Sequence, residues 1–377
     1  MSSDTVPPLD VVKSTHVWMS DGTIVLHATS SKTKTAVLFR VHKSVLALNC
    51  AAFQALFGDD TTVLDQSSEQ YEGVPVMHTY EDANDMEDFL RALYYPEYMQ
   101  RHNEPMKHKL SMNSFPKLYM GAMRLARKFD APRLYSEFQH ILLRLFPKTL
   151  SDAQRTFTMY YDREVEQFNW AQAHKQWCDE WELIEQNWPD PAYAIRIAVD
   201  LSLPDVLPTA FYVLMKAYQD MYTDPDGNQD FDTVSHIKCY GDLNALTKDD
   251  LKVLLVGSAA VRNWLSNHWI FPMDATSGKL EHCDPPSARH RCYERFCPLW
   301  DDMVIRTRSR EAQVDPLRFL SKEHDEILSK AKLCENCRGQ ASKLFDPLRE
   351  RLWKRLPTLF NLTKYGVDEN WGEPNAW

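Results

Sequence analysis

Between Val37 and Phe57 the spacing of apolar residues changes from the period of a strand to the period of a helix. Val37 to Val41 is a run of β-favouring residues around Arg40, which predicts a strand that ends at His42. Beyond His42, apolar residues recur every three or four positions, the spacing that lines one face of a helix. These residues are Val45, Leu46, Leu48, Ala52, Phe53, Leu56 and Phe57. A strand that leads directly into helices restricts this part of the chain to a mixed α and β fold.

The same stretch resembles the centre of a BTB/POZ domain, in which a hairpin is followed by a histidine-lysine-x-x-leucine helix and then by a second helix. Here the motif is His42-Lys-Ser-Val-Leu46. Further segments resemble the large fungal branch of that family in the same order, over residues 11 to 147. They are Val17 to Ala28, Gly73 to Tyr80, Asp85 to Pro96 and Arg124 to Leu134.

The resemblance implies an α+β fold for residues 15–147, a small sheet flanked by helices, and a role in protein–protein interaction. BTB domains commonly self-associate through the first strand and the helix of the motif. A homodimer, or a complex with another protein partner, is therefore expected. The residues implied for the interface are Val17, Trp18, Val45, Leu46, Leu48 and Phe53.

Some BTB proteins are substrate adaptors of cullin-type ubiquitin ligases and bind the cullin scaffold through a hydrophobic-x-Glu element after the second helix. The corresponding region, 58–72, has no clear copy, because Val63-Leu64 is followed by Asp65 and Gln66. The adaptor role is an alternative that this departure disfavours.

Outside residues 15–147, a short disordered lead and an all-helical second half are expected. Residues 1–14 are expected to be a disordered lead, 148–189 a Trp-rich helical linker, and 190–377 a helical C-terminal domain. The last of these resembles the BACK regions that follow many BTB domains.

Four tryptophans in the linker recur at spacings of seven, four and seven residues, which places them on one stripe of a helix. They are Trp170, Trp177, Trp181 and Trp188. The stripe is interpreted as a packing face. The alternative is an exposed docking face, but a patch of that size is uncommon on a monomer.

Composition and charge limit the classes of partner. The formal net charge of −10 argues against nucleic acid as the main partner, because phosphate binding needs a local excess of Lys and Arg. The basic runs 289–295 and 306–310 are interpreted as solvated faces, and a transcriptional or chromatin regulator would need them to form one continuous basic face. No signal peptide or membrane-length apolar run is present, so an intracellular protein with reduced thiols is expected, nuclear or cytoplasmic.

Cysteines near the C-terminus form the best candidate for a metal site. Cys334-Glu-Asn-Cys337 is a CxxC pair, and Cys283 and Cys292 supply two further thiols. Four sulfur ligands suit a closed, structural zinc site, since zinc prefers tetrahedral sulfur and nitrogen ligands. The fungal BTB proteins that the chain resembles have a similar pair and a similar CxxC. Chelation is then expected to loosen the C-terminal half.

Three alternatives to that ligand set stay open. The cysteines are buried thiols, or they form a redox disulfide, or one of them is replaced as a ligand. The substitute ligands are Cys297, His282 and His290.

The sequence has no glycine-rich phosphate loop, no G-x-S-x-G, no H-E-x-x-H and no kinase signature. No catalytic or cofactor-binding residue is therefore assigned, and a protein that is not an enzyme is expected. The BTB resemblance implies a structural role for His42 at the strand-to-helix junction.

Overall fold

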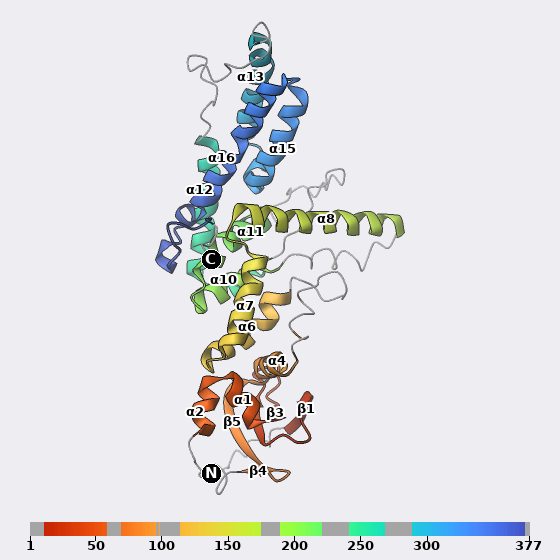
Figure 1. Cartoon of the computed structure of the whole chain (residues 1–377), viewed down its shortest axis with the longest axis vertical. Coiled ribbons are helices and arrows are strands. Elements are labelled where there is room, and N and C mark those ends of the chain that lie inside the picture. Colours follow the sequence, from red (N-terminus) through yellow and green to blue (C-terminus); the bar gives the residue numbers. More distant parts are fainter. Residues whose placement is uncertain are drawn as a thin grey trace, which may run out of the picture. The chain divides into compact units, whose positions relative to one another are not determined.

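The computed structural model describes residues 11–58, 69–95, 98, 114–174, 189–220, 241–267 and 289–373. The chain divides into two compact units, Met1–Leu142 and Leu143–Trp377. A small curled sheet lies in the first unit, and the chain after it is mostly helical (Figure 1). The expected mixed α+β class, with a small N-terminal sheet followed by helices, is therefore confirmed at this level.

Five strands form the sheet of the first unit, in the order β1-β3-β2-β5-β4. β1 pairs parallel with β3, β2 pairs antiparallel with β3 and parallel with β5, and β4 pairs antiparallel with β5. The bounds are β1 Val11–Trp18, β2 Ile24–Thr29, β3 Ala36–Val41, β4 Gln70–Tyr71 and β5 Val74–Asp82.

The strand-to-helix change predicted at His42 is confirmed. β3 ends at Val41, and His42 is the extended residue that precedes α1. Its backbone N–H donates to the hydroxyl of Tyr94, 2.8 Å away, which fixes the junction to a later helix. The described helices of this part are α1 Lys43–Asn49, α2 Ala51–Gly58, α4 Ala83–Tyr94, α6 Ser114–Lys128 and α7 Pro132–Leu145.

Aromatic side chains hold the helices of the first unit to one another. The ring of Phe129 lies 4.7 Å from that of Phe53 and 5.5 Å from that of Phe89, centroid to centroid. Phe53 and Phe89 are buried, as is Phe39 on β3. Burial of aromatic rings contributes a large part of the stability of a core, so this cluster fixes α2 and α4 in place.

The second unit is built from helices. They are α8 Leu150–His174, α10 Pro191–Asp200, η1 Pro204–Val206, α11 Leu207–Asp220, η2 Leu243–Ala245, α12 Lys248–Asn267, α13 Arg289–Arg306, α14 Arg310–Val314, α15 Pro316–Lys330, α16 Glu335–Leu359 and η4 Thr363–Tyr365. The tryptophan stripe lies outside what the structure describes, except for the backbone of Trp170 within α8. Among residues with described positions, no helix combines the length and the apolar character needed to span a membrane.

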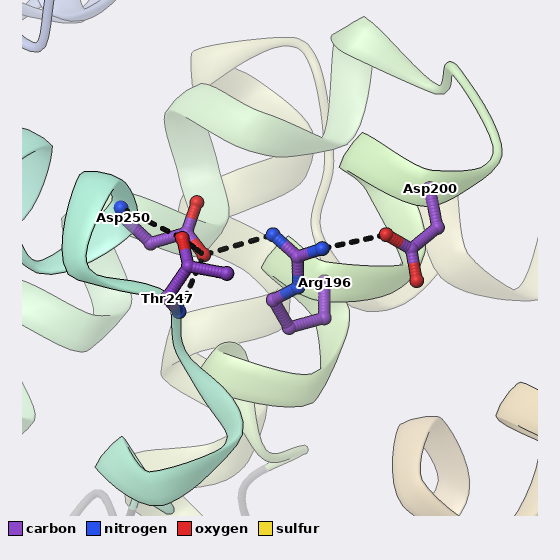
Figure 2. A network of polar contacts seen from close by, with 4 residues as sticks. All are labelled: Arg196, Asp200, Thr247 and Asp250. Atoms are coloured by element: carbon purple, nitrogen blue, oxygen red, sulfur yellow. Dashed lines mark hydrogen bonds and ion pairs between the residues drawn. The ribbon is translucent and has the colours of Figure 1, made fainter.

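A polar network joins α10 to the start of α12 (Figure 2). The hydroxyl of Thr247 accepts from the backbone N–H of Asp250, and the carboxylate of Asp250 accepts from the backbone N–H of Thr247. This reciprocal pair satisfies two N–H groups at the helix start that have no partner within the helix. The guanidinium of Arg196 then bridges Asp250, at 2.9 Å, to Asp200, at 2.6 Å. The buried carboxylate of Asp250 is therefore paired, which a buried charge requires.

One apolar cluster joins three helices of the second unit, α13, α15 and α16. Residues of α13, α15 and α16 meet around Trp300, Phe319 and Phe345, all of them buried. Leu333, in the turn between α15 and α16, packs against this cluster and also against a smaller one formed by cysteines. The cysteines therefore lie at the margin of a packed helical core.

Candidate metal centre

Three cysteines converge where α13 and α16 begin. Cys292 lies in the first turn of α13, Cys334 is the N-cap of α16, and Cys337 lies in the first turn of α16. The chain reverses direction between α15 and α16 through Lys332, whose φ is 46°. Arg295, one turn after Cys292, donates to the carbonyl of Lys332 at 3.1 Å. This contact helps to hold the turn that presents Cys334 against α13.

The sulfur atoms of Cys292, Cys334 and Cys337 all lie within 4.8 Å of one another. Cys292 and Cys337 are buried and Cys334 is partly exposed. Tetrahedral zinc with Zn–S bonds of about 2.3 Å places its sulfur ligands about 3.8 Å apart. The sulfur separations in the structure therefore exceed that spacing by about 1 Å at most.

The chemistry of these donors fits a thiophilic metal. Thiolates are soft ligands that select zinc and related ions over magnesium or calcium. Two of the three sulfurs also lie at the N-terminus of α16, where the positive end of the helix dipole stabilises a thiolate. The described cluster is therefore compatible with a structural zinc site.

Of the four predicted ligands, the structure brings Cys292, Cys334 and Cys337 together. Cys283 lies outside the described residues, as do His282 and the side chain of His290. Cys297 is described, on α13, but it is not part of the three-sulfur cluster. Burial raises the pKa of the Cys297 thiol, so the thiolate is less accessible there than at an exposed cysteine.

The interface residues implied for the first unit lie in different environments. Val17, Leu46 and Phe53 are buried in the unit itself. Trp18 and Val45 are partly exposed, and Leu48 is 85% exposed. Among these residues, Leu48 has the side chain that is most available to a partner.

A buried ion pair in the second unit was not predicted from the sequence. The ammonium of Lys216 on α11 lies 2.7 Å from the carboxylate of Asp315, which precedes α15. The hydroxyls of Tyr161 and Tyr212 donate to the same carboxylate at 2.7 and 2.6 Å. The local sequence Asp315-Pro316 indicates the start of a helix, since Asp is favoured at the N-cap and Pro at the first helical position, but it does not indicate the ion pair.

Opposing effects set the ionisation of this pair. Burial alone would raise the pKa of Asp315, but the charge of Lys216 and the hydrogen bonds from Lys216 and the tyrosines lower it to about 2. Burial alone would lower the pKa of Lys216, but the negative charge of Asp315 raises it. Both groups are therefore charged at neutral pH, and their contacts join α8, α11 and α15.

Comparisons of the chain with models of known protein families, with curated proteins and with solved structures found no match.

The cysteine cluster leads to a direct prediction. We expect the purified protein to hold one zinc ion per chain, and Cys337→Ser to lose most of it because a buried ligand is removed. Metal content by plasma mass spectrometry measures the stoichiometry. Charge-transfer bands of the cobalt-substituted protein report thiolate ligation. Chelation is expected to lower the free energy of unfolding by about 3 kcal/mol if zinc was present at a hundred times its Kd.

Cys297→Ser is the matched control for Cys337→Ser, because Cys297 is a cysteine of α13 outside the cluster. It is expected to keep its zinc. Cys283→Ser tests the fourth ligand. Retention of zinc by Cys337→Ser, or absence of zinc from the wild-type protein purified without chelators, would rule out the site.

Proposed function

We propose that the chain is a non-enzymatic protein-interaction protein of the BTB/POZ type, whose first unit associates with a second copy of itself. In this proposal the second unit is a helical body in which structural zinc joins the starts of α13 and α16. The observation that carries the proposal is the exposed apolar side chain of Leu48, on the helix that directly follows β3.

Apolar residues continue from Leu48 onto the next helix. Leu56 is 43% exposed, and three alanines of α2 are also exposed, Ala51, Ala52 and Ala55. An exposed surface of this composition supports a protein contact, because burying it removes apolar area from water. A second copy is the proposed partner, since the chain resembles a family in which this helix commonly takes part in self-association.

The order of elements supports the BTB/POZ assignment. An antiparallel pair, β2 and β3, leads into the helices α1 and α2, and β5 then leads into α4. This is the order in which the matching sequence segments occur in that family. Because fold does not determine chemistry, the proposal that the protein is not an enzyme rests on the absence of catalytic motifs in the sequence.

The proposed zinc site has a structural role. Cys292 would hold the start of α13, and Cys334 and Cys337 would hold the start of α16. The site would add cross-links beside Leu333, which packs on the core of this helical bundle. Three thiolates from the chain and a fourth protein ligand leave no open position for a substrate.

Leu48→Glu tests self-association. We expect light scattering to give the mass of a dimer for the wild-type protein and the mass of a monomer for the variant. The reason is that a carboxylate would have to be buried in an apolar contact. A loss of at least 2 kcal/mol, about thirtyfold in the dimer Kd, is expected for a central interface residue.

Tyr80→Glu is the matched control, because Tyr80 is a fully exposed side chain of β5 in the same unit. It is expected to leave the mass unchanged. A wild-type protein that is monomeric at all concentrations, or a Leu48→Glu protein that dimerises as tightly as wild type, would contradict the proposal.

A further inference from the structure

The curled sheet of the first unit brings its two edges together. β1 and β4 are at opposite ends of the strand order, yet the rings of Trp18 and Tyr71 are only 6.0 Å apart, at an interplanar angle of 85°. Trp18 is the last residue of β1 and Tyr71 the last of β4. Both residues are partly exposed, so solvent and a ligand can reach the two rings.

Buried side chains support these two rings from below. Trp18 and Tyr71 pack on a cluster from the interior strands, formed by Val25, Leu38, Val74 and Val76. Each of the four is 8% exposed or less. Rings that rest on a buried layer have few alternative positions, which is the arrangement a preorganised binding site needs.

A carboxylate lies beside the rings at the tip of a hairpin. β4 and β5 are joined by Glu72 and Gly73, with φ values of 50° and 76°, and Tyr71 pairs with Val74 across the turn. Two central residues with positive φ are characteristic of the type I′ turn of tight hairpins. This conformation is uncommon for a glutamate. The side chain of Glu72 reaches from this turn to Lys13 of β1.

Lys13 of β1 fills the space between these groups. Its ammonium nitrogen lies 4.7 Å from the centroid of the Trp18 ring, 5.5 Å from that of Tyr71 and 2.5 Å from Oε1 of Glu72. The hydrogen bond to Glu72 raises the pKa of Lys13. Two aromatic faces and a carboxylate around an ammonium group are the elements by which proteins recognise lysine-type and quaternary ammonium cations.

We propose that Trp18, Tyr71 and Glu72 form a recognition site for a methylated lysine of a partner protein, and that Lys13 of the same chain occupies the site until the partner displaces it. This inference rests on the proposal that the first unit is a protein-interaction module, and it names the chemistry of one ligand.

Any ligand of this site has to displace Lys13, and a methylated lysine is the favoured ligand because it can bind more strongly than Lys13 does. Lys13 is tethered beside the site, and a tethered group competes at an effective concentration in the millimolar range. An unmodified lysine has the same ammonium group as Lys13 and therefore binds the two rings and Glu72 no more strongly than Lys13 does. N-methyl groups add apolar contact with the two rings and reduce the hydration that must be removed.

The position of Lys13 allows it to leave the site. Among the strands that the structure describes, β1 is an edge strand paired with β3, and its register shifts between Lys13 and Trp18. The Lys13 and Glu72 side chains are 42% and 47% exposed, so their ion pair is weak. Loss of this contact opens the site without disturbing the buried layer below it.

The test uses the full chain and a fluorescent peptide that contains one trimethyl-lysine, with binding followed by fluorescence anisotropy. Lys13→Ala is expected to bind this peptide about tenfold more tightly than wild type, because the internal competitor is removed. Glu72→Gln in the Lys13→Ala background is expected to lose most of that gain. Glu72 is exposed, so this variant is expected to remain folded. Tetramethylammonium chloride should compete with the peptide.

Lys32→Ala is the matched control, since it removes an exposed lysine of the same unit, and it is expected to bind as wild type does. Equal affinity of Lys13→Ala and wild type, or tight binding that survives Glu72→Gln, would overturn the inference. Equal affinity for the trimethylated and the unmodified peptide would overturn the preference for methylated lysine. Light scattering on the same samples separates the two proposals: a dimer that binds no peptide contradicts this inference alone.

Discussion

Asp315→Ala is expected to lower the free energy of unfolding of the second unit by about 3 to 5 kcal/mol. The substitution removes the carboxylate that neutralises the buried ammonium of Lys216. The side chains of Lys216 and Asp315 are 6% and 11% exposed, so water does not replace the lost contact. A lone buried charge is among the most destabilising changes that a single substitution makes.

Asp315 has further contacts that alanine loses. Its carboxylate accepts from the backbone N–H of Arg318 and so caps α15, which starts with Pro316. It also accepts from Tyr212, whose hydroxyl oxygen in turn accepts from the backbone N–H of Leu317. Loss of the cap alone costs about 1 kcal/mol. Because the network joins three helices, its loss weakens the packing of the whole second unit.

Chemical denaturation followed by circular dichroism measures the expected change. The matched control is Asp325→Ala, on the same helix, because the Asp325 side chain is 83% exposed and its removal is expected to change stability by less than about 0.5 kcal/mol. Similar losses for the two variants would contradict the role assigned to the buried pair.

The same pair gives a pH dependence with a defined sign. The pKa of Asp315 is lowered from 3.8 to about 2 in the folded protein. The contribution of Asp315 to the free energy of unfolding is therefore fully present above pH 3.8 and is lost as the pH falls toward 2. The reason is that the Asp315 carboxylate takes up its proton at a higher pH in the unfolded chain than in the folded protein. The difference in stability between wild type and Asp315→Ala should narrow over that interval.

Trp371→Ala is expected to lower the free energy of unfolding by about 3 to 5 kcal/mol, the range for removal of a buried aromatic side chain. Trp371 is 1% exposed, and its ring lies 5.2 Å from that of Trp353 on α16. Its indole N–H donates to the carbonyl of Asp205 at 3.0 Å, and that of Trp353 donates to the carbonyl of Lys148 at 2.8 Å. Alanine therefore leaves a cavity and an unpaired carbonyl.

Two further variants separate these effects in thermal and denaturant unfolding. Trp371→Phe keeps an aromatic ring and loses the N–H, so a smaller cost is expected, about 1 to 2 kcal/mol. Glu369→Ala, at an exposed position nearby, is expected to have little effect. A Trp371→Ala protein as stable as Glu369→Ala would show that the packing of the two indoles contributes little.

The elements that sequence reasoning predicted are those with local signals. The strand before His42 and the helix after it follow from apolar spacing over a short stretch, and both occur where expected. The CxxC pair is also local, since Cys334 and Cys337 lie within one helical turn. Cys292 was proposed with Cys283 as a further zinc ligand, on ligand chemistry and on the BTB resemblance, and of these two the described residues include Cys292.

The features that were missed depend on contacts between distant residues. Nothing near Lys216 in the sequence indicates that it pairs with Asp315, because the pair forms only when α11 packs beside the start of α15. The exposure of Leu48 and the burial of Leu46 could not be predicted from the nearby sequence either. Both are leucines of one short amphipathic helix, and which of them faces the core depends on the packing of α1.

Co-purification of an untagged chain with a tagged chain, expressed together, tests directly whether the first unit binds a second copy. We expect the tagged chain to retain the untagged wild-type chain in near-equal amount, and the untagged chain to be lost when both carry Leu48→Glu. Passage of the untagged wild-type chain through the column, with the tagged chain folded and retained, would show that the first unit does not self-associate.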